Sequence, residues 1–174
     1  RFLYTLEFFP EEGKYHYDGH RLCGVRLSPQ ETKKHKNICP QCGKPVTVGV
    51  MNRVDQLADR PEGFTPKNAI PYKNMISLDE IIADAKGVSK TSVAVEREYL
   101  SIISRFQNEF DILLRASEAD LRKNVPPKIA DGVMRVRRGQ VHIKAGYDGE
   151  YGIISIFGDD PQQGAKSEKQ LSLF

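Results

Sequence analysis

The sequence contains no tryptophan, only three cysteines and no long apolar run. An odd number of cysteines cannot pair completely within the chain, which points away from a secreted disulfide framework. No segment approaches the roughly 18 apolar residues that span a bilayer. No Walker-type phosphate loop is present, so we expect no ATPase activity in these residues. The apolar opening RFLYTLEFFP is short and is followed by glutamates, so it predicts a strand rather than a signal peptide. We expect a cytoplasmic protein, and a fragment, since the first residue is Arg1.

The proportions of hydrophobic and charged residues are those of a folded protein. The chain has 174 residues, of which 39% are hydrophobic and 28% charged, enough for one ordinary domain or two small ones. Its net charge of +3 is unevenly distributed, because residues 14–53 and 121–144 each carry +6 and the block 54–120 carries −4. Such blocks are either solvated faces or local concentrations of positive charge that bind phosphate, so nucleic acid is a candidate partner.

Two short motifs share one pattern: a metal-ligating residue, two spacers, a second ligating residue and a glycine. They are HRLCG and CPQCG, and fifteen residues separate their ligands. A glycine after the second ligand permits the tight turn in which backbone N–H groups point at a metal-bound sulfur. Thiolate and imidazole ligands at this spacing are typical of a small zinc ribbon in a reducing compartment. We predict a zinc site formed by His20, Cys23, Cys39 and Cys42.

Alternatives to this ligand set stay open. His16 could replace His20 as the fourth ligand, and the cysteines could instead form a buried thiol beside a redox C-x-x-C pair. A hydrolase that uses Cys23 with a histidine would require a cysteine free of metal. Four protein ligands leave no position for a catalytic water, so we expect a structural zinc ion.

The remaining elements follow from local patterns. We expect a strand at VTVGV (46–50), an ordered connector over the proline-rich residues 59–72, and then helices. Capping boxes at Ser77 and Ser117 predict two helix starts, and Pro126–Pro127 predict a third helix that ends at Gly139. Between them, helical spacing predicts one continuous buried face with the members Val95, Tyr99, Ile102, Phe106, Phe110 and Leu113.

The end of the last helix is basic, and a predicted β-hairpin, AGYDGEYGIISIF, follows it. Arginines at this position are equally explained by the negative end of the helix dipole, and an Asp-Gly pair by a simple tight turn. Glycines also let a backbone approach a ligand, and tyrosine rings offer stacking faces to bases. We predict a DNA-binding surface that comprises Arg135, Arg137, Arg138, Lys144, Tyr147, Asp148 and Tyr151.

After Phe157 the sequence becomes polar, which predicts a flexible tail, and it ends on QLSLF. This pentapeptide resembles the peptide that binds the bacterial sliding clamp. The resemblance implies that Gln170 makes a polar contact and that Leu171, Leu173 and Phe174 enter hydrophobic pockets of the clamp.

Three longer motifs occur in a fixed order: EFFPEEGKYHYDGHRLCGV, CPQCGKPVTVGVMNRVDQLADRPEGF and AGYDGEYGIISIF. Over residues 3–157 the chain resembles the C-terminal half of the endonuclease Q family, whose members are often labelled helicase-like, and we expect a bacterial protein. The resemblance implies an N-terminal PHP-type domain with catalytic divalent metals, a zinc-binding part, and a C-terminal domain in a DNA-repair enzyme that nicks 5′ of deaminated bases and abasic sites. It also implies that His20 and the three cysteines bind zinc and that the hairpin engages the damaged strand.

The sequence has no counterpart of the PHP domain, since its four histidines form no H-x-H cluster. We therefore expect this chain to be catalytically silent alone and to position DNA, help select an extruded base and recruit the enzyme to replicated DNA at the nucleoid. The alternatives are a non-enzymatic DNA-binding and sliding-clamp adaptor and a helicase accessory module.

The predicted fold class is α+β, a small zinc ribbon followed by a helical subdomain with a C-terminal hairpin. The predicted division is residues 1–58 for the zinc-binding domain, 59–76 for the connector, 77–157 for the helical DNA-binding domain and 158–174 for the tail.

Overall fold

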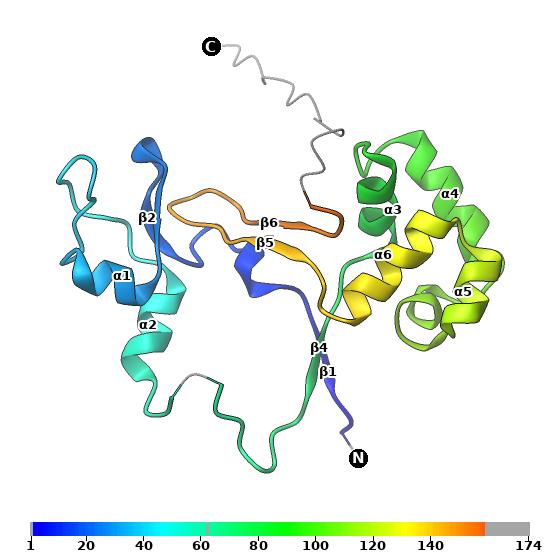
Figure 1. The fold of residues 1–174 in the computed structure, drawn as a ribbon, viewed down its shortest axis with the longest axis horizontal. Coiled ribbons are helices and arrows are strands. Elements are labelled where there is room, and N and C mark those ends of the chain that lie inside the picture. The colour runs from blue at the N-terminus through cyan, green and yellow to red at the C-terminus, as the bar shows by residue number, and fades with distance from the viewer. Residues whose placement is uncertain (1, 62, 159–174) are drawn as a thin grey trace. The chain divides into compact units, whose positions relative to one another are not determined.

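The computed structural model describes residues 2–61 and 63–158, and it has the predicted α+β character (Figure 1). The chain forms two compact units. Of the described residues, the first unit contains those up to residue 74 together with 143–154, and the second contains residues 75–142 together with 155–158. In the described part of the chain, no helix combines the length and the apolar character that crossing a membrane demands.

The first unit is built around a small antiparallel hairpin. Strands β2 (Asp18–His20) and β3 (Val25–Leu27) pair with Asp18 opposite Leu27, and the short 3-10 helix η2 (Arg21–Cys23) connects them. Another 3-10 helix, η1 (Pro10–Glu12), precedes the hairpin. The core of this ribbon consists of four buried residues, Val25, Leu27, Cys39 and Val46.

Two helices that were not predicted from the sequence follow the hairpin. Helix α1 (Pro29–Lys34) begins with a capping box, in which Ser28 and Glu31 bond each other's backbone N–H groups. Helix α2 (Val50–Leu57) begins where a strand was expected at residues 46–50, and that expectation was wrong apart from one bridge between Thr47 and Gly19. The cause is buried Asp18, whose carboxylate accepts hydrogen bonds from the Gly49 N–H and from the Asn52 side chain at the start of α2.

The opening segment forms a strand as predicted. Strand β1 (Thr5–Glu7) pairs in parallel with β4 (Tyr72–Asn74), with Thr5 opposite Tyr72. The two strands lie side by side in Figure 1. The residues between α2 and β4 that the structure describes form no regular element.

The second unit is helical. Its elements are α3 (Leu78–Lys86), α4 (Val93–Ile103), the π-helical turn η3 (Asp111–Arg115), α5 (Glu118–Asn124) and α6 (Pro127–Arg137). Helix α3 packs against both α4 and α6, and Ile81, Ile102 and Val133 are fully buried. As predicted, Gly87 ends α3 in the left-handed conformation, Ser117 caps α5, and Pro127 occupies the first turn of α6.

Two details of the helical prediction were wrong. The Ser77 side chain forms no cap on α3, because the Asp79 carboxylate accepts the Glu80 N–H, which the capping box would have used, at 2.9 Å. The Glu109 carboxylate accepts the Leu78 N–H at 2.7 Å. The expected continuous apolar helix is interrupted after Ile103, and Phe110 is 50% exposed. The Asn108 side chain accepts the Asp111 N–H and starts η3, so the apolar residues after the interruption belong to a different element.

The predicted C-terminal hairpin strands are present as β5 (His142–Lys144) and β6 (Ile153–Ser155), which pair with each other. This hairpin was predicted to belong with the helices, whereas its turn belongs to the first unit. The reason is a set of backbone hydrogen bonds between the turn and residues 11–17, described below.

Candidate metal centre and nucleic-acid interface

Two backbone turns, each followed by a left-handed glycine, hold the predicted metal ligands. In the first, η2 follows His20 and ends at Cys23, and the Gly24 N–H bonds the Arg21 carbonyl. In the second, the Gly43 N–H bonds the Cys39 carbonyl at 2.9 Å. Both glycines are left-handed, with φ of 62° and 71°. The tight turn expected after the second ligand of each motif needs such a conformation, which glycine adopts readily.

The two turns bring the four predicted ligands together. One ligand atom each from His20, Cys23, Cys39 and Cys42 lies within 4.8 Å of all the others. The Cys42 Sγ lies 3.4 Å from the His20 Nδ1. In a tetrahedral site with a Zn–S bond of about 2.3 Å and a Zn–N bond of about 2.0 Å, the sulfur and nitrogen atoms would lie about 3.5 Å apart, so this spacing fits such an ion. The cluster can therefore hold a metal ion.

The surroundings favour the thiolate form of Cys39 and oppose the thiolate form of Cys23. Burial by itself raises the pKa of the Cys39 thiol, but the N–H groups of Cys42 and Gln41 outweigh it and lower the pKa to about 7. Burial, and then hydrogen bonds that the Cys23 thiol donates to Cys42 and Cys39, raise the pKa of Cys23 to about 11. Three thiolates this close repel one another, and a divalent cation removes that repulsion.

His16, the alternative fourth ligand, lies outside this cluster. It is buried, its Nδ1 lies 3.1 Å from the Pro10 carbonyl oxygen, and its ring packs edge-on against Tyr17. The group of clustered ligand atoms contains His20 instead. The geometry therefore favours His20 in this role.

The hairpin turn is fastened to the first metal-binding turn. One carboxylate oxygen of Asp148 accepts the Arg21 N–H, and the other accepts the Thr47 hydroxyl. Burial by itself raises the pKa of Asp148, but these two donors outweigh it, so the pKa lies below its ordinary value. Asp148 was predicted to contact DNA, and in the structure it joins parts of the protein.

The glycines and one tyrosine of the turn also serve packing. The Gly152 N–H bonds the Glu12 carbonyl, and a Cβ at Gly152 would collide with the Glu11 carbonyl oxygen. Tyr147 is only 7% exposed, because its ring lies against the backbone of Gly19. The close approach that these glycines permit is thus to the protein's own backbone, and Tyr147 offers no free ring face for stacking.

Tyr151, unlike Tyr147, is exposed to solvent. Its side chain is 72% exposed, and the Lys14 ammonium lies 5.5 Å from its ring centroid. Tyr15, half-exposed, also lies near Lys14. Tyr151 lines a groove of about 580 Å³ together with Phe9, Pro10, Glu12, Gly13 and Gly152. This exposed cluster of Lys14, Tyr15 and Tyr151 combines positive charge with stacking faces, and the KYHY segment was its signal in the sequence.

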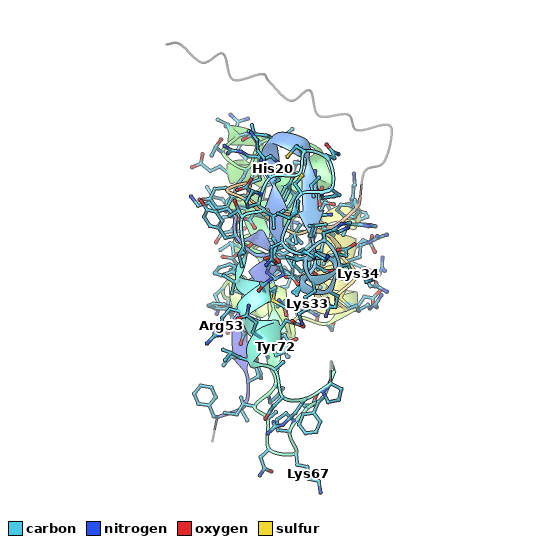
Figure 2. The ribbon with its side chains drawn as sticks, turned by 90° about the vertical axis from the view of Figure 1, so that its left-hand side faces the viewer. His20, Lys33, Lys34, Arg53, Lys67 and Tyr72 are labelled. Carbon is cyan, nitrogen blue, oxygen red and sulfur yellow. The ribbon has the colours of Figure 1, made fainter. Side chains whose placement is uncertain are left out.

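Basic side chains also follow the first unit along α1 and α2. Figure 2 shows Lys33, Lys34 and Arg53 between His20 and Tyr72. Lys33 is paired with Asp55 at 2.5 Å, and Arg53 donates to Gln56. Lys144 is exposed on β5.

The three predicted DNA-binding arginines of α6 have different surroundings. Arg137 donates to the carbonyls of Ile112, Leu113 and Ala116, and burial lowers its pKa. Arg135 pairs with Asp131, four residues earlier, and lies over the Phe157 ring. Arg138 is exposed and pairs with Glu118. Arg137 is therefore committed to the end of η3, whereas Arg138 keeps an exposed guanidinium. The predicted clamp-binding residues, Gln170, Leu171, Leu173 and Phe174, lie outside the described residues.

Comparisons with known proteins support one relationship. Residues 77–140 match the family model described as the MJ0043 C-terminal domain. The chain is similar in structure to the lesion-specific endonuclease Q of Pyrococcus furiosus, with a TM-score of 0.75, 29% identity, and coverage of 87% of this chain and 37% of that one. These comparisons support an endonuclease Q-like C-terminal part.

A second endonuclease Q structure, a complex with a 27-mer duplex that carries an abasic lesion at the active site, gives a TM-score of 0.70 at 28% identity. It covers 94% of this chain and 40% of its own. Among curated proteins, the chain is 34% identical over 147 residues to the uncharacterized protein MJ0043 of Methanocaldococcus jannaschii and 32% identical over 146 residues to YqxK of Bacillus subtilis. These alignments cover 84% and 83% of the chain. The chain spans 18% and 33% of the lengths of these two relatives.

Proposed function

We propose that this chain is the zinc-binding, DNA-engaging C-terminal region of a DNA-repair endonuclease that nicks 5′ of deaminated bases or abasic sites. The observation that carries the proposal is the likeness to endonuclease Q at 28–29% identity over most of the chain, including a structure solved with a lesion-bearing duplex. The nicking chemistry would belong to a PHP-type domain outside these residues. The role of this chain would then be to bind and position DNA.

In this proposed role the metal site is structural and takes no part in the nicking reaction. Its donor set, three sulfur atoms and one imidazole nitrogen, is the kind that selects zinc, and four protein ligands leave no open position for substrate. Bound zinc would supply a rigid crosslink between the two turns. Because Asp148 joins the first turn to the hairpin, that rigidity would extend to the loop that presents Tyr151.

The exposed cluster is the best candidate for contact with DNA. Lys14 would neutralise a phosphate, and Tyr151 would stack on an unpaired base, an interaction worth about 1–3 kcal/mol. A deaminated or abasic nucleotide costs less to unstack than a paired one, so stacking at an unpaired site favours damaged DNA.

The test is fluorescence anisotropy of this chain with matched duplexes that carry deoxyuracil, an abasic site or no lesion, over a salt series. We expect all three to bind more weakly as salt rises, since phosphate contacts release counterions. We expect the damaged duplexes to bind more tightly at each salt concentration. Absence of binding at low salt would refute the proposal.

Two tyrosine variants sharpen this test. Tyr151→Ala should remove most of the preference for damaged DNA. Tyr72→Ala is the matched control, because Tyr72 is similarly exposed, at 64%, but lies on β4. Equal loss in both variants would show that the preference does not depend on the exposed cluster.

The tail extends the proposal to a partner. QLSLF would dock this region on the bacterial sliding clamp and bring the enzyme to replicated DNA. The support is the sequence of the peptide alone. Deleting residues 170–174 should abolish retention by immobilised clamp while leaving the melting temperature unchanged, and retained binding would contradict the assignment.

A further inference from the structure

A parallel sheet of only two strands, such as β1–β4, is unusual as a complete sheet. Its two strands are parallel, and within the described residues neither pairs with a third strand. Parallel sheets occur almost only as larger assemblies with both faces covered, because the crossover connections between parallel strands place helices on the faces of the sheet. Each outer edge of such a pair also leaves backbone N–H and C=O groups without a strand neighbour.

The segment that contains β1 is mostly apolar, although the paired residues themselves are mixed, since Thr5, Glu7, Lys73 and Asn74 are polar. The segment FLYTLEFF, residues 2–9, is a nearly continuous apolar run. Four of its side chains are exposed, and so are two beside them on the β4 side. The exposed fractions are 69% for Phe2, 70% for Leu3, 38% for Leu6, 67% for Phe8, 53% for Ile70 and 64% for Tyr72.

The two faces can be told apart by the pairing register. Leu6 lies opposite Lys73, and the Lys73 ammonium lies 4.4 Å from the Tyr4 ring centroid, so these three side chains share a face. Thr5 and Tyr72, which lie opposite each other, share the other face. Exposed apolar groups therefore occur on both faces, and soluble monomers seldom expose contiguous apolar surface of this kind.

The lengths of the relatives indicate what covers this sheet. The 174 residues span only 37% and 40% of the solved endonuclease Q chains, although those chains match most of this one. Further strands of a parallel sheet normally come from the same polypeptide, through crossover connections.

We propose that the β1–β4 sheet is the docking surface for the remaining part of a longer endonuclease Q-like polypeptide, which adds at least one extended strand to an edge of the sheet and covers its apolar faces. The proposal rests on the endonuclease Q-like relationship stated above. It adds a specific interface through which the DNA-engaging region is attached to the part that would carry the nuclease.

The test compares this chain with the full-length product of its reading frame by hydrogen–deuterium exchange. Amides in residues 3–8 and 72–74 should exchange at least about 100-fold more slowly in the full-length protein, since strand addition protects both edges and faces. Amides of α3 and α6 should exchange at similar rates in both proteins. Because the measurement uses no DNA, a failure of lesion binding would leave its result unaffected.

A pair of variants provides the matched control. Phe8→Ser should leave the melting temperature of this chain nearly unchanged, since Phe8 is exposed, but it should reduce the protection of residues 3–8 in the full-length protein. Val50→Ser, at a side chain that is 63% exposed on α2, should change neither.

Three outcomes would overturn the proposal. The first is equal exchange of the sheet amides in both proteins. The second is protection that rises with the concentration of this chain together with a dimer in sedimentation velocity, which would assign the surface to a second copy. The third is a reading frame that encodes no further domain.

Discussion

The Asp148 carboxylate accepts the Arg21 N–H at 2.6 Å, a contact between residues 127 positions apart in the chain. Arg21 lies between the two ligands of the first metal-binding turn, so the hairpin holds that turn directly. The second carboxylate oxygen accepts the Thr47 hydroxyl, which fastens the segment after the second turn as well. One side chain thus connects the hairpin with both halves of the metal-binding ribbon.

Replacing Asp148 with alanine should lower the free energy of unfolding of the first unit by about 1–2 kcal/mol, the lower end for charge-assisted hydrogen bonds because the group is partly exposed. Asp148→Asn keeps one acceptor oxygen and should cost less. Chemical denaturation of the zinc-loaded protein measures both. An alanine variant as stable as the parent would show that the two bonds contribute nothing net.

The contribution of Asp148 should also depend on pH. Its folded pKa lies below the ordinary value, because the Arg21 N–H and the Thr47 hydroxyl outweigh the opposing effect of burial. The stability it provides is therefore complete above the unfolded pKa of about 3.9 and is lost as pH falls through the folded pKa. The stability difference between the parent and Asp148→Ala should be constant above about pH 5 and shrink below pH 4. A difference that grows toward acid would contradict this assignment.

Removal of the metal should unfold the ribbon selectively. A chelator removes the cation that neutralises the charge of three close thiolates and holds the two turns together. Amides in residues 14–50 should therefore lose protection in hydrogen exchange. Amides of α3 and α6 belong to the other unit and should keep theirs. Cys39→Ser should reproduce the loss, and metal analysis should then find less than one zinc per chain. Unchanged protection of residues 14–50 after chelation would argue against a structural metal.

Two neighbouring arginines should respond differently to substitution. Arg137→Ala leaves the carbonyls of Ile112, Leu113 and Ala116 without their donor and should destabilise the second unit by about 2–3 kcal/mol. Arg138→Ala removes an exposed guanidinium and should change stability little, while weakening DNA binding and its salt dependence. Denaturation curves and anisotropy titrations of both variants check these outcomes. The reverse pattern would show that Arg137 contacts DNA.

Gly152 should tolerate no side chain. An alanine there would place its Cβ against the Glu11 carbonyl oxygen and disturb the bond from the Gly152 N–H to Glu12. We expect Gly152→Ala to cost about 1–3 kcal/mol. Gly63→Ala, where the added Cβ meets no atom within 4 Å, provides the control for steric contact, although its positive φ carries a cost of its own. Equal losses in thermal melts of the two variants would contradict a specific clash at Gly152.

The parts of the site that could be predicted are those whose cause is local. Two turns with the same spacing gave the four clustered ligands, and the helix ends at Gly87 and Ser117 depend on residues within one turn. Helix α1 was predictable too, since Ser28 and Glu31 have the spacing of a capping box.

What could not be predicted depends on distant partners. The glycines of the hairpin turn indicate a close approach, but nothing nearby shows that the approaching group is the carbonyl of Glu11 rather than a ligand. The same is true of Arg137, whose acceptors lie more than twenty residues away, and of α2, which begins where buried Asp18 supplies an acceptor. The hairpin glycines and Arg137 were predicted to have a function, whereas Asp18 was not singled out, and in all three cases the tertiary contact determines the role.

The position of residues 143–154 within the first unit also has a consequence for biosynthesis. A ribosome releases the metal-binding ribbon long before it releases Tyr147 and Asp148, which complete that unit. The nascent ribbon can bind its ion early. Its contacts from Tyr147 to Gly19 and from Asp148 to Thr47 form only after the helical segment has been synthesised. Neither unit can therefore be transplanted as one continuous piece of gene, and a recombination breakpoint between residues 75 and 142 would separate the ribbon from the loop that closes it.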